Sequence, residues 1–227
     1  MKPLTRLSLI FVAGFCDTAS FIHMHGVFTA HITGNIVFFA VSLAKGIQKT
    51  DFLKIITFPV FILGVVIATS IYGKVIKDES HHQRLLLLMT SILILSALIT
   101  NFFSFKTGNI DLGWIDVAVT LALVIAMATQ NAIHHFIPGP ITTLMTGTIM
   151  NTTATLTEKF ILGHTILNKA TPVSAPENSL WRIFSFFIGC VIAAVMTIKL
   201  GLSSVIVPAI TMLLVLALER TKGKFDE

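Results

Sequence analysis

The chain has 227 residues, of which 54% are hydrophobic and 12% charged, and its mean hydropathy is +0.87. Soluble domains carry about 25% charged residues, so this composition excludes a soluble globule and predicts a helical protein that crosses the membrane several times. The net charge of +5 does not indicate nucleic acid, because Lys and Arg fall in short loops, where they set topology and contact anionic lipid.

Eight apolar segments follow one another and predict an all-α fold. They are 7–24, 29–45, 55–76, 85–104, 114–134, 141–158, 182–200 and 203–219. Each is long enough to cross, or nearly cross, a hydrocarbon core of about 30 Å at about 1.5 Å per residue. Segments 29–45 and 141–158 are doubtful, because each directly follows a polar interruption. We therefore expect six to eight transmembrane segments.

The positive charges leave both topologies open. If all eight segments cross, 12 of the 16 Lys and Arg residues lie inside; if 29–45 and 141–158 are re-entrant, 11 do. Both distributions satisfy the positive-inside rule and place both termini in the cytoplasm. The apolar start reads as a retained first helix instead of a signal peptide. We expect a multi-pass protein of the inner (cytoplasmic) membrane.

The second half of the chain resembles the first. A shift of 125 residues aligns FILGVVIA (61–68) with FFIGCVIA (186–193), and a shift of 113 aligns glycines and threonines that apolar composition alone does not supply. The aligned pairs are Ala19 with Ala132, Gly26 with Gly139, Thr29 with Thr142, Thr33 with Thr146, Gly34 with Gly147 and Ile36 with Ile149.

We therefore expect two related membrane halves, 1–104 and 114–219, with a linker at 105–113 and a cytoplasmic tail at 220–227. Four crossings per half would make the halves parallel, whereas three would invert the second. Both arrangements occur in secondary transporters, whose solute sites lie near the midplane between repeats.

Two polar stretches interrupt the apolar pattern, GVFTAHITGN at 26–35 and GPITTLMTGT at 139–148. A tight turn explains part of each: Gly26 can adopt a positive φ, Thr29 can cap the next helix, and prolines 138 and 140 prevent a continuous one. The Thr-Gly pairs at 33–34 and 146–147 are expected a turn inside the following helix, where glycine costs about 1 kcal/mol relative to alanine. Helix packing and solute contact both explain these glycines.

Asp17 is the one carboxylate well inside an apolar segment. Inserting it costs about 2.5–3.5 kcal/mol, so it should face the interior and find a partner, either as a functional group or as a structural carboxyl. Its repeat counterpart is Gln130, followed by Asn131. In segment 141–158, seven Thr and Asn residues lie on or beside one helical face, which predicts a hydrated wall unless each hydroxyl bonds its own helix.

The remaining residue patterns do not predict a metal site, a disulfide or an enzyme. The spacing of His23, His25 and His31 matches no helical ligand pair, so neither a metal nor a cofactor is expected. Cys16 and Cys190 fall in apolar segments and should be small packed residues without a disulfide. Small residues four apart, at 64 and 68 and again at 189 and 193, predict helix packing. No phosphate-binding loop or hydrolase motif is present, so we do not expect an enzyme.

The sequence resembles the YoaK-type family of bacterial integral membrane proteins over essentially its whole length. The resemblance rests on FVAGFCDTASF, GVFTAHITGN, ATQNAI and TTLMTGT, with matching residues Gly14, Asp17, Gly26, Phe28, Thr33, Gly34, Asn35, Gln130, Asn131, Thr142, Thr143, Thr146 and Gly147. It implies a cytoplasmic-membrane protein of about six helices and unestablished function. His31 departs from the family pattern, which has asparagine there more often.

Taken together, these features favour a small-solute permease or channel-like transporter with a site between repeats. The expected solute-binding residues are Asp17, Thr33, Gly34, Asn35, Gln130, Asn131, Thr142, Thr146 and Gly147. The alternative is a non-transporting membrane scaffold or accessory subunit, in which the same glycines only pack helices. Expected partners are the lipid bilayer and a small molecule or ion, without nucleic acid; self-association into a homo-oligomer is left open.

Overall fold

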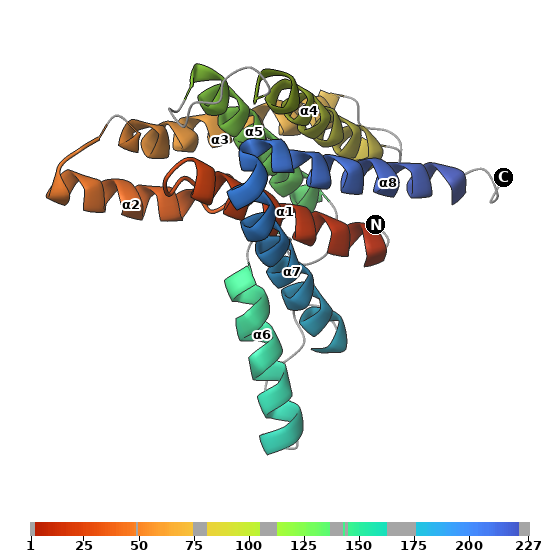
Figure 1. Cartoon of the computed structure of the whole chain (residues 1–227). Coiled ribbons are helices and arrows are strands. Elements are labelled where there is room, and N and C mark those ends of the chain that lie inside the picture. Colours follow the sequence, from red (N-terminus) through yellow and green to blue (C-terminus); the bar gives the residue numbers. More distant parts are fainter. Residues whose placement is uncertain are drawn as a thin grey trace.

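The computed structural model describes residues 3–48, 50–74, 81–104, 113–136, 143, 145–162 and 176–222. These residues form helices and no strand, which confirms the all-α expectation (Figure 1). The helices are α1 (Pro3–His23), α2 (Ile32–Lys45), α3 (Asp51–Lys74), α4 (His81–Ser104), α5 (Trp114–Phe136), α6 (Met145–Thr157), the π-helix η1 (Glu158–Leu162), α7 (Pro176–Leu200), the 3-10 helix η2 (Gly201–Val205) and α8 (Ile206–Lys222).

Each of the eight expected segments corresponds to one α-helix, but α2 and α6 begin later than expected. α2 begins at Ile32 and α6 at Met145. The Thr-Gly pairs at 33–34 and 146–147 therefore lie in the first turn of each helix, and the expectation that they lie a turn inside was wrong. The penalty for glycine in a helix interior does not apply there, because the first turn lacks intrahelical partners for its amides.

Among the described residues, five apolar segments are long enough to cross a membrane: Pro3–His23, Asp51–Tyr72, Gln83–Phe103, Trp114–His134 and Ser179–Glu219, the last of which covers most of α7 and α8. α2 and α6 are shorter, with 14 and 13 residues. At about 1.5 Å per residue these two helices reach only about 20 Å, less than the roughly 30 Å of a hydrocarbon core. By itself, each of these two helices is shorter than that core is thick, and α6 continues directly into η1.

The most extensive helix pairs are α1 with α7, α4 with α5, and α3 with α5. Each pair joins a helix of the first half to one of the second, so the two halves share one core. The buried side chains of this core include Leu9, Val12 and Cys16 of α1, Met89 and Leu93 of α4, Leu123 and Met127 of α5, and Met212 of α8.

Glycines allow two of these pairs to approach closely. A Cβ at Gly14 of α1 would lie 2.5 Å from the carbonyl oxygen of Phe186 on α7, and one at Gly189 would overlap the carbonyl oxygen of Phe11. A Cβ at Gly64 of α3 would lie 2.7 Å from the Ala128 Cβ of α5. These contacts confirm the helix-packing interpretation of Gly64 and Gly189.

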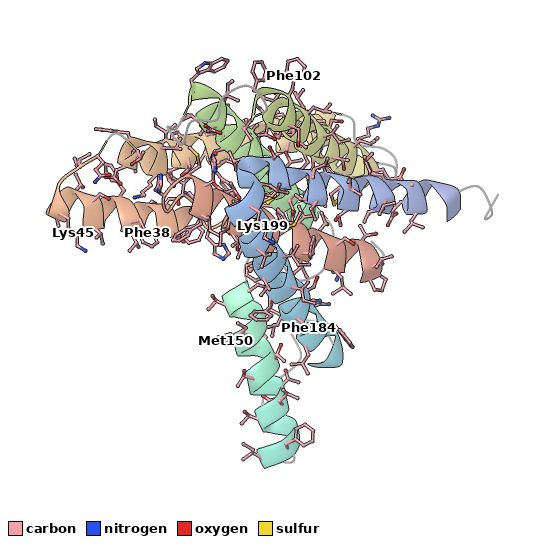
Figure 2. All side chains as sticks on the ribbon, in the orientation of Figure 1. Phe38, Lys45, Phe102, Met150, Phe184 and Lys199 are labelled. Carbon is pink, nitrogen blue, oxygen red and sulfur yellow. The ribbon has the colours of Figure 1, made fainter. Side chains whose placement is uncertain are left out.

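α2 leads away from the end of α1 instead of folding back along it (Figure 1). Within the described part of the chain, α2 packs against α3 and α6 packs against α7. α6 and the first part of α7 extend beyond the other helices, and Figure 2 shows Met150 and Phe184 on this extension. The polar interruption therefore does not form a hairpin in which α1 and α2 pack against each other as antiparallel helices.

Candidate functional site at the break between α1 and α2

Residues 24–31 separate α1 from α2 and form no helix. Gly26 has a φ of +96°, and its amide donates to the Phe21 carbonyl at 2.8 Å, which ends α1. The preceding residue, His25, also has a positive φ, of 52°. Glycine adopts such a conformation without the steric penalty of a side chain. The expected turn at Gly26 is confirmed.

Asp17 of α1 holds this break together. Its Oδ1 atom accepts hydrogen bonds from the Thr29 amide at 2.7 Å, the Ala30 amide at 2.6 Å and the Thr29 hydroxyl at 3.1 Å. Its Oδ2 atom pairs with Nδ1 of His31. The side chain of Asp17 is 4% exposed. Asp17 therefore has the buried partners that its cost in a membrane requires.

These bonds explain why α2 begins at Ile32. The Thr29 hydroxyl was expected to cap the next helix, but it donates to Asp17 instead, and the residue before α2, His31, makes no side-chain capping bond. The bonds from Thr29 and Ala30 to Asp17 hold these two residues in the non-helical segment that precedes α2. The capping prediction for Thr29 was wrong.

His31 lies between the apolar segments Pro3–His23 and Asp51–Tyr72. Its side chain is 33% exposed, whereas that of Asp17 is 4% exposed. The hydrogen bond to Asp17 raises the pKa of His31 above its ordinary value, and partial burial opposes that rise. The imidazole also contacts the Phe28 and Phe186 rings, with centroids at 5.9 and 6.1 Å.

Asn35, in the first turn of α2, also bonds to the break. Its Oδ1 accepts from the Phe28 amide at 2.7 Å, and its Nδ2 donates to the Phe28 carbonyl and to the Thr57 hydroxyl of α3, both at 2.8 Å. Asn35 is fully buried. The amide side chain thus replaces backbone partners that an interrupted helix lacks.

A buried ion pair lies beside the break, and it was not identified from the sequence. The Lys54 ammonium donates to Asp51 at 2.6 Å, both side chains are about 8% exposed, and the Gln48 amide donates to the second carboxylate oxygen at 2.8 Å. The Lys54 ammonium lies 6.0 Å from the Phe38 ring centroid, and its carbon stem lies next to Gly26. The sequence offered one signal, an acid and a base three residues apart at a helix start.

The remaining expected residues of the first half behave differently from Asp17 and Asn35. Thr33 is exposed. Gly34 is half-buried, and a Cβ there would lie 3.0 Å from the Phe28 ring. Gly34 thus lets the aromatic ring of the break pack on α2, while Thr33 points away from Asp17's network.

In the second half, Asn131 of α5 accepts a hydrogen bond from the Thr143 hydroxyl at 2.6 Å. As in the first half, a polar side chain of the preceding helix holds the segment before the short helix. The neighbouring Gln130 is buried and donates to the Leu9 carbonyl of α1 at 3.0 Å, which ties the halves together. Thr142 lies outside the described residues.

In α6 the expected site residues lie at the surface of the chain. Thr146 and Gly147 are exposed, and a Cβ at Gly147 would meet no atom within 4 Å. The Thr152 and Thr155 hydroxyls donate to carbonyls four residues back, so these two satisfy their own helix. The structure thus brings Asp17 and Asn35 together at one break and leaves Thr33, Thr146 and Gly147 outside it.

The arrangement offers a specific chemistry: a buried carboxylate whose ionisable neighbour reaches the surface of the chain. A proton can pass between such groups, and a change in their charge alters the bonds that hold residues 29–31. The two cysteines are free, and the Cys190 thiol donates to the Gly14 carbonyl at 3.6 Å.

Comparison with known proteins identifies the family. The UPF0700 transmembrane protein YoaK of Bacillus subtilis (strain 168) is 31% identical over 148 residues, which cover 64% of this chain and 63% of that protein. The aligned region thus spans less than two thirds of that relative's length. No solved structure matches the chain. The family described as "Protein of unknown function (DUF1275)" matches residues 6–218. This chain belongs to that family, and it is a multi-pass membrane protein.

Proposed function

We propose that this protein is a small-solute permease of the cytoplasmic membrane, in which the Asp17–His31 pair couples protonation to movement of the break. The observation that carries the proposal is this pair: a carboxylate whose side chain is 4% exposed, bonded to an imidazole that is one-third exposed. Ionisable residues within membrane helices commonly mark ion and substrate paths.

The hydrogen bonds indicate how such coupling would operate. A charged Asp17 accepts strong bonds from the amides of Thr29 and Ala30. Proton transfer to the carboxylate weakens these bonds, because the neutral form is a poorer acceptor. The non-helical segment then loses the contacts that hold it in this conformation. His31 provides the route by which the proton arrives.

The helix arrangement supports transport as well. α1 packs on α7 through Gly189, and α5 packs on α3 through Gly64, which is the repeat counterpart of Gly189. The two halves thus make the same contact reciprocally. A break between α1 and α2 resembles the discontinuous helices around which inverted-repeat transporters build their sites.

We infer six crossings and inverted halves, because α2 leads on from α1 and is too short to return across the bilayer. Both termini are then cytoplasmic, and Gln48 lies outside the cell. An alkaline phosphatase reporter fused at Gln48 should be active and a fluorescent-protein fusion at the same site dark. The opposite pattern would require eight crossings and parallel halves.

Proteoliposomes test the permease proposal. Stopped-flow shrinkage measures entry of glycerol and urea, and quenching of a pH-sensitive dye measures proton flux under a potassium–valinomycin potential. We expect faster flux than in protein-free vesicles and at least a tenfold loss in Asp17→Asn. His31→Asn, in which the partly exposed ring is replaced by a neutral amide, should remove the pH dependence. Intact transport in Asp17→Asn combined with Gly34→Leu would refute the site.

The rival function, a non-transporting scaffold or accessory subunit, is favoured by the completeness of the Asp17 and Asn35 hydrogen bonds, which suffice to build a rigid loop. Flux equal to that of protein-free vesicles, together with a partner retained in mild detergent, would establish it.

Self-association fits either function, because α6 and the start of α7 extend from the other helices with Met150 and Phe184 exposed (Figure 2). A molar mass of one chain in detergent would exclude it.

A further inference from the structure

A separate groove lies between α4 and α5, away from the break. Its volume is about 320 Å³, at the lower end of the range for small-molecule sites. Both helices belong to membrane-crossing segments. The lining is apolar apart from one serine and includes Ile92, Ile99 and Phe103 of α4 and Trp114, Val119 and Ile125 of α5.

That serine, Ser96, has an unpaired hydroxyl although it is 1% exposed. Other hydroxyl groups on α4 behave differently: Thr90, Ser91 and Thr100 each donate to the carbonyl four residues back. A buried hydroxyl without a partner is costly and requires an explanation. Because the rest of the groove is apolar, an oxygen atom brought by an occupant is the acceptor that would satisfy Ser96.

The position of Ser96 limits what that occupant is. Ser96 lies eight residues before the end of α4, about 12 Å along the helix, so the acceptor sits well below the lipid head groups. Phe103, near the end of α4, and Trp114, at the start of α5, stand at the end of the groove nearer the helix ends and are 41% and 78% exposed. Their rings suit stacking with a planar group that enters from the bilayer.

We propose that this groove binds the ring of a lipid-soluble carbonyl compound, of the quinone class, with one carbonyl oxygen accepting the Ser96 hydroxyl. The ring occupies the groove and the hydrocarbon tail remains in the bilayer. The site does not depend on the permease proposal, since it shares no residue with the break.

Fluorescence quenching tests the assignment in nanodiscs. The chain has two tryptophans, so Trp181→Phe leaves Trp114 as the single reporter beside the groove. A decyl-substituted benzoquinone is titrated, because quinones quench indole fluorescence. Ser96→Ala removes the donor, Ala122→Phe fills the groove, and Ser91→Ala is the matched control, since that serine is exposed and already bonded to Leu87.

We expect saturable quenching that Ser91→Ala leaves unchanged, that Ser96→Ala weakens roughly 2–12-fold, as one hydrogen bond predicts, and that Ala122→Phe abolishes. Quenching that rises linearly, or that persists in Ala122→Phe, would reduce the effect to partitioning and overturn the site. Equal affinities in Ser96→Ala and Ser91→Ala would overturn the carbonyl assignment. Saturable quenching by brominated phosphatidylcholine that the quinone does not displace would assign the groove to a phospholipid acyl chain instead.

Discussion

The close approach of α1 and α7 gives a quantitative prediction for Gly14→Ala. The new Cβ would lie 2.5 Å from the Phe186 carbonyl oxygen and 3.2 Å from the Cys190 sulfur. The carbonyl belongs to a helix backbone, so it cannot rotate away and the two helices must separate. Overpacking of this kind costs about 1–3 kcal/mol.

Alanine also favours helix formation over glycine by about 0.5–1 kcal/mol in a helix interior, which offsets part of the steric cost at Gly14. Gly147→Ala is the control without a clash, because it lies in the first turn of α6 and a Cβ there meets no atom within 4 Å. The net loss of stability at Gly14 is then up to about 2.5 kcal/mol. At roughly 2–4 °C per kcal/mol for a chain of this size, Gly14→Ala should melt below Gly147→Ala by up to roughly 10 °C.

The assay is thermal unfolding in one detergent at one scan rate, followed by circular dichroism at 222 nm. A fixed scan rate matters because membrane proteins commonly unfold irreversibly. If Gly14→Ala melted at or above the temperature of Gly147→Ala, the reasoning on the α1–α7 contact would be refuted, and with it the reciprocal packing of the two halves.

Two further predictions concern the break. Asn35→Ala should destabilise the protein by roughly 2–3 kcal/mol, because the buried Asn35 side chain makes three hydrogen bonds that are lost. Thr33→Ala, at an exposed position, should change stability by no more than about 0.5 kcal/mol. Equal melting temperatures of the two variants would contradict the role of Asn35 in holding the break. Since the pKa of His31 is raised in the fold above 6.5, its stabilisation is complete below about pH 6.5 and is lost as the pH rises through the raised value. The wild-type melting temperature should therefore fall more steeply between pH 6 and pH 9 than that of His31→Asn, and parallel curves would show that the pair contributes nothing.

The helices were predictable because long apolar segments have few alternatives in a bilayer. The turn at Gly26 and the packing role of Gly189 followed from local rules as well, since a positive φ and a close backbone approach both select glycine. The need of Asp17 for a buried partner followed from its cost in lipid. These features depend on one segment and its immediate chemistry.

The partners of Asp17 could not be predicted from the sequence, because they depend on tertiary structure. Asp17 takes the amides of residues 12 and 13 positions ahead, so the start of α2 is set by another helix. The burial of Lys54 under α2 is likewise invisible in a segment that reads as a charged loop. Helical periodicity also does not say whether Thr33 faces its neighbours or the surroundings of the protein, and in the structure it faces the surroundings.

What touches Thr33 in the membrane decides between the two functions. Thr33 and Val37 lie four residues apart on α2, and both are exposed in the isolated chain, so exposure alone does not separate water from lipid. In a background without Cys16 and Cys190, Thr33→Cys and Val37→Cys can be compared by reaction with a membrane-impermeant maleimide and with a lipid-soluble one. A hydrated path predicts that the impermeant reagent labels position 33 at least tenfold faster than position 37. Equal and slow labelling, with fast reaction of both cysteines toward the lipid-soluble reagent, would mean that acyl chains surround this face. The break would then be a structural joint, and the permease proposal would fail even with every hydrogen bond of Asp17 in place.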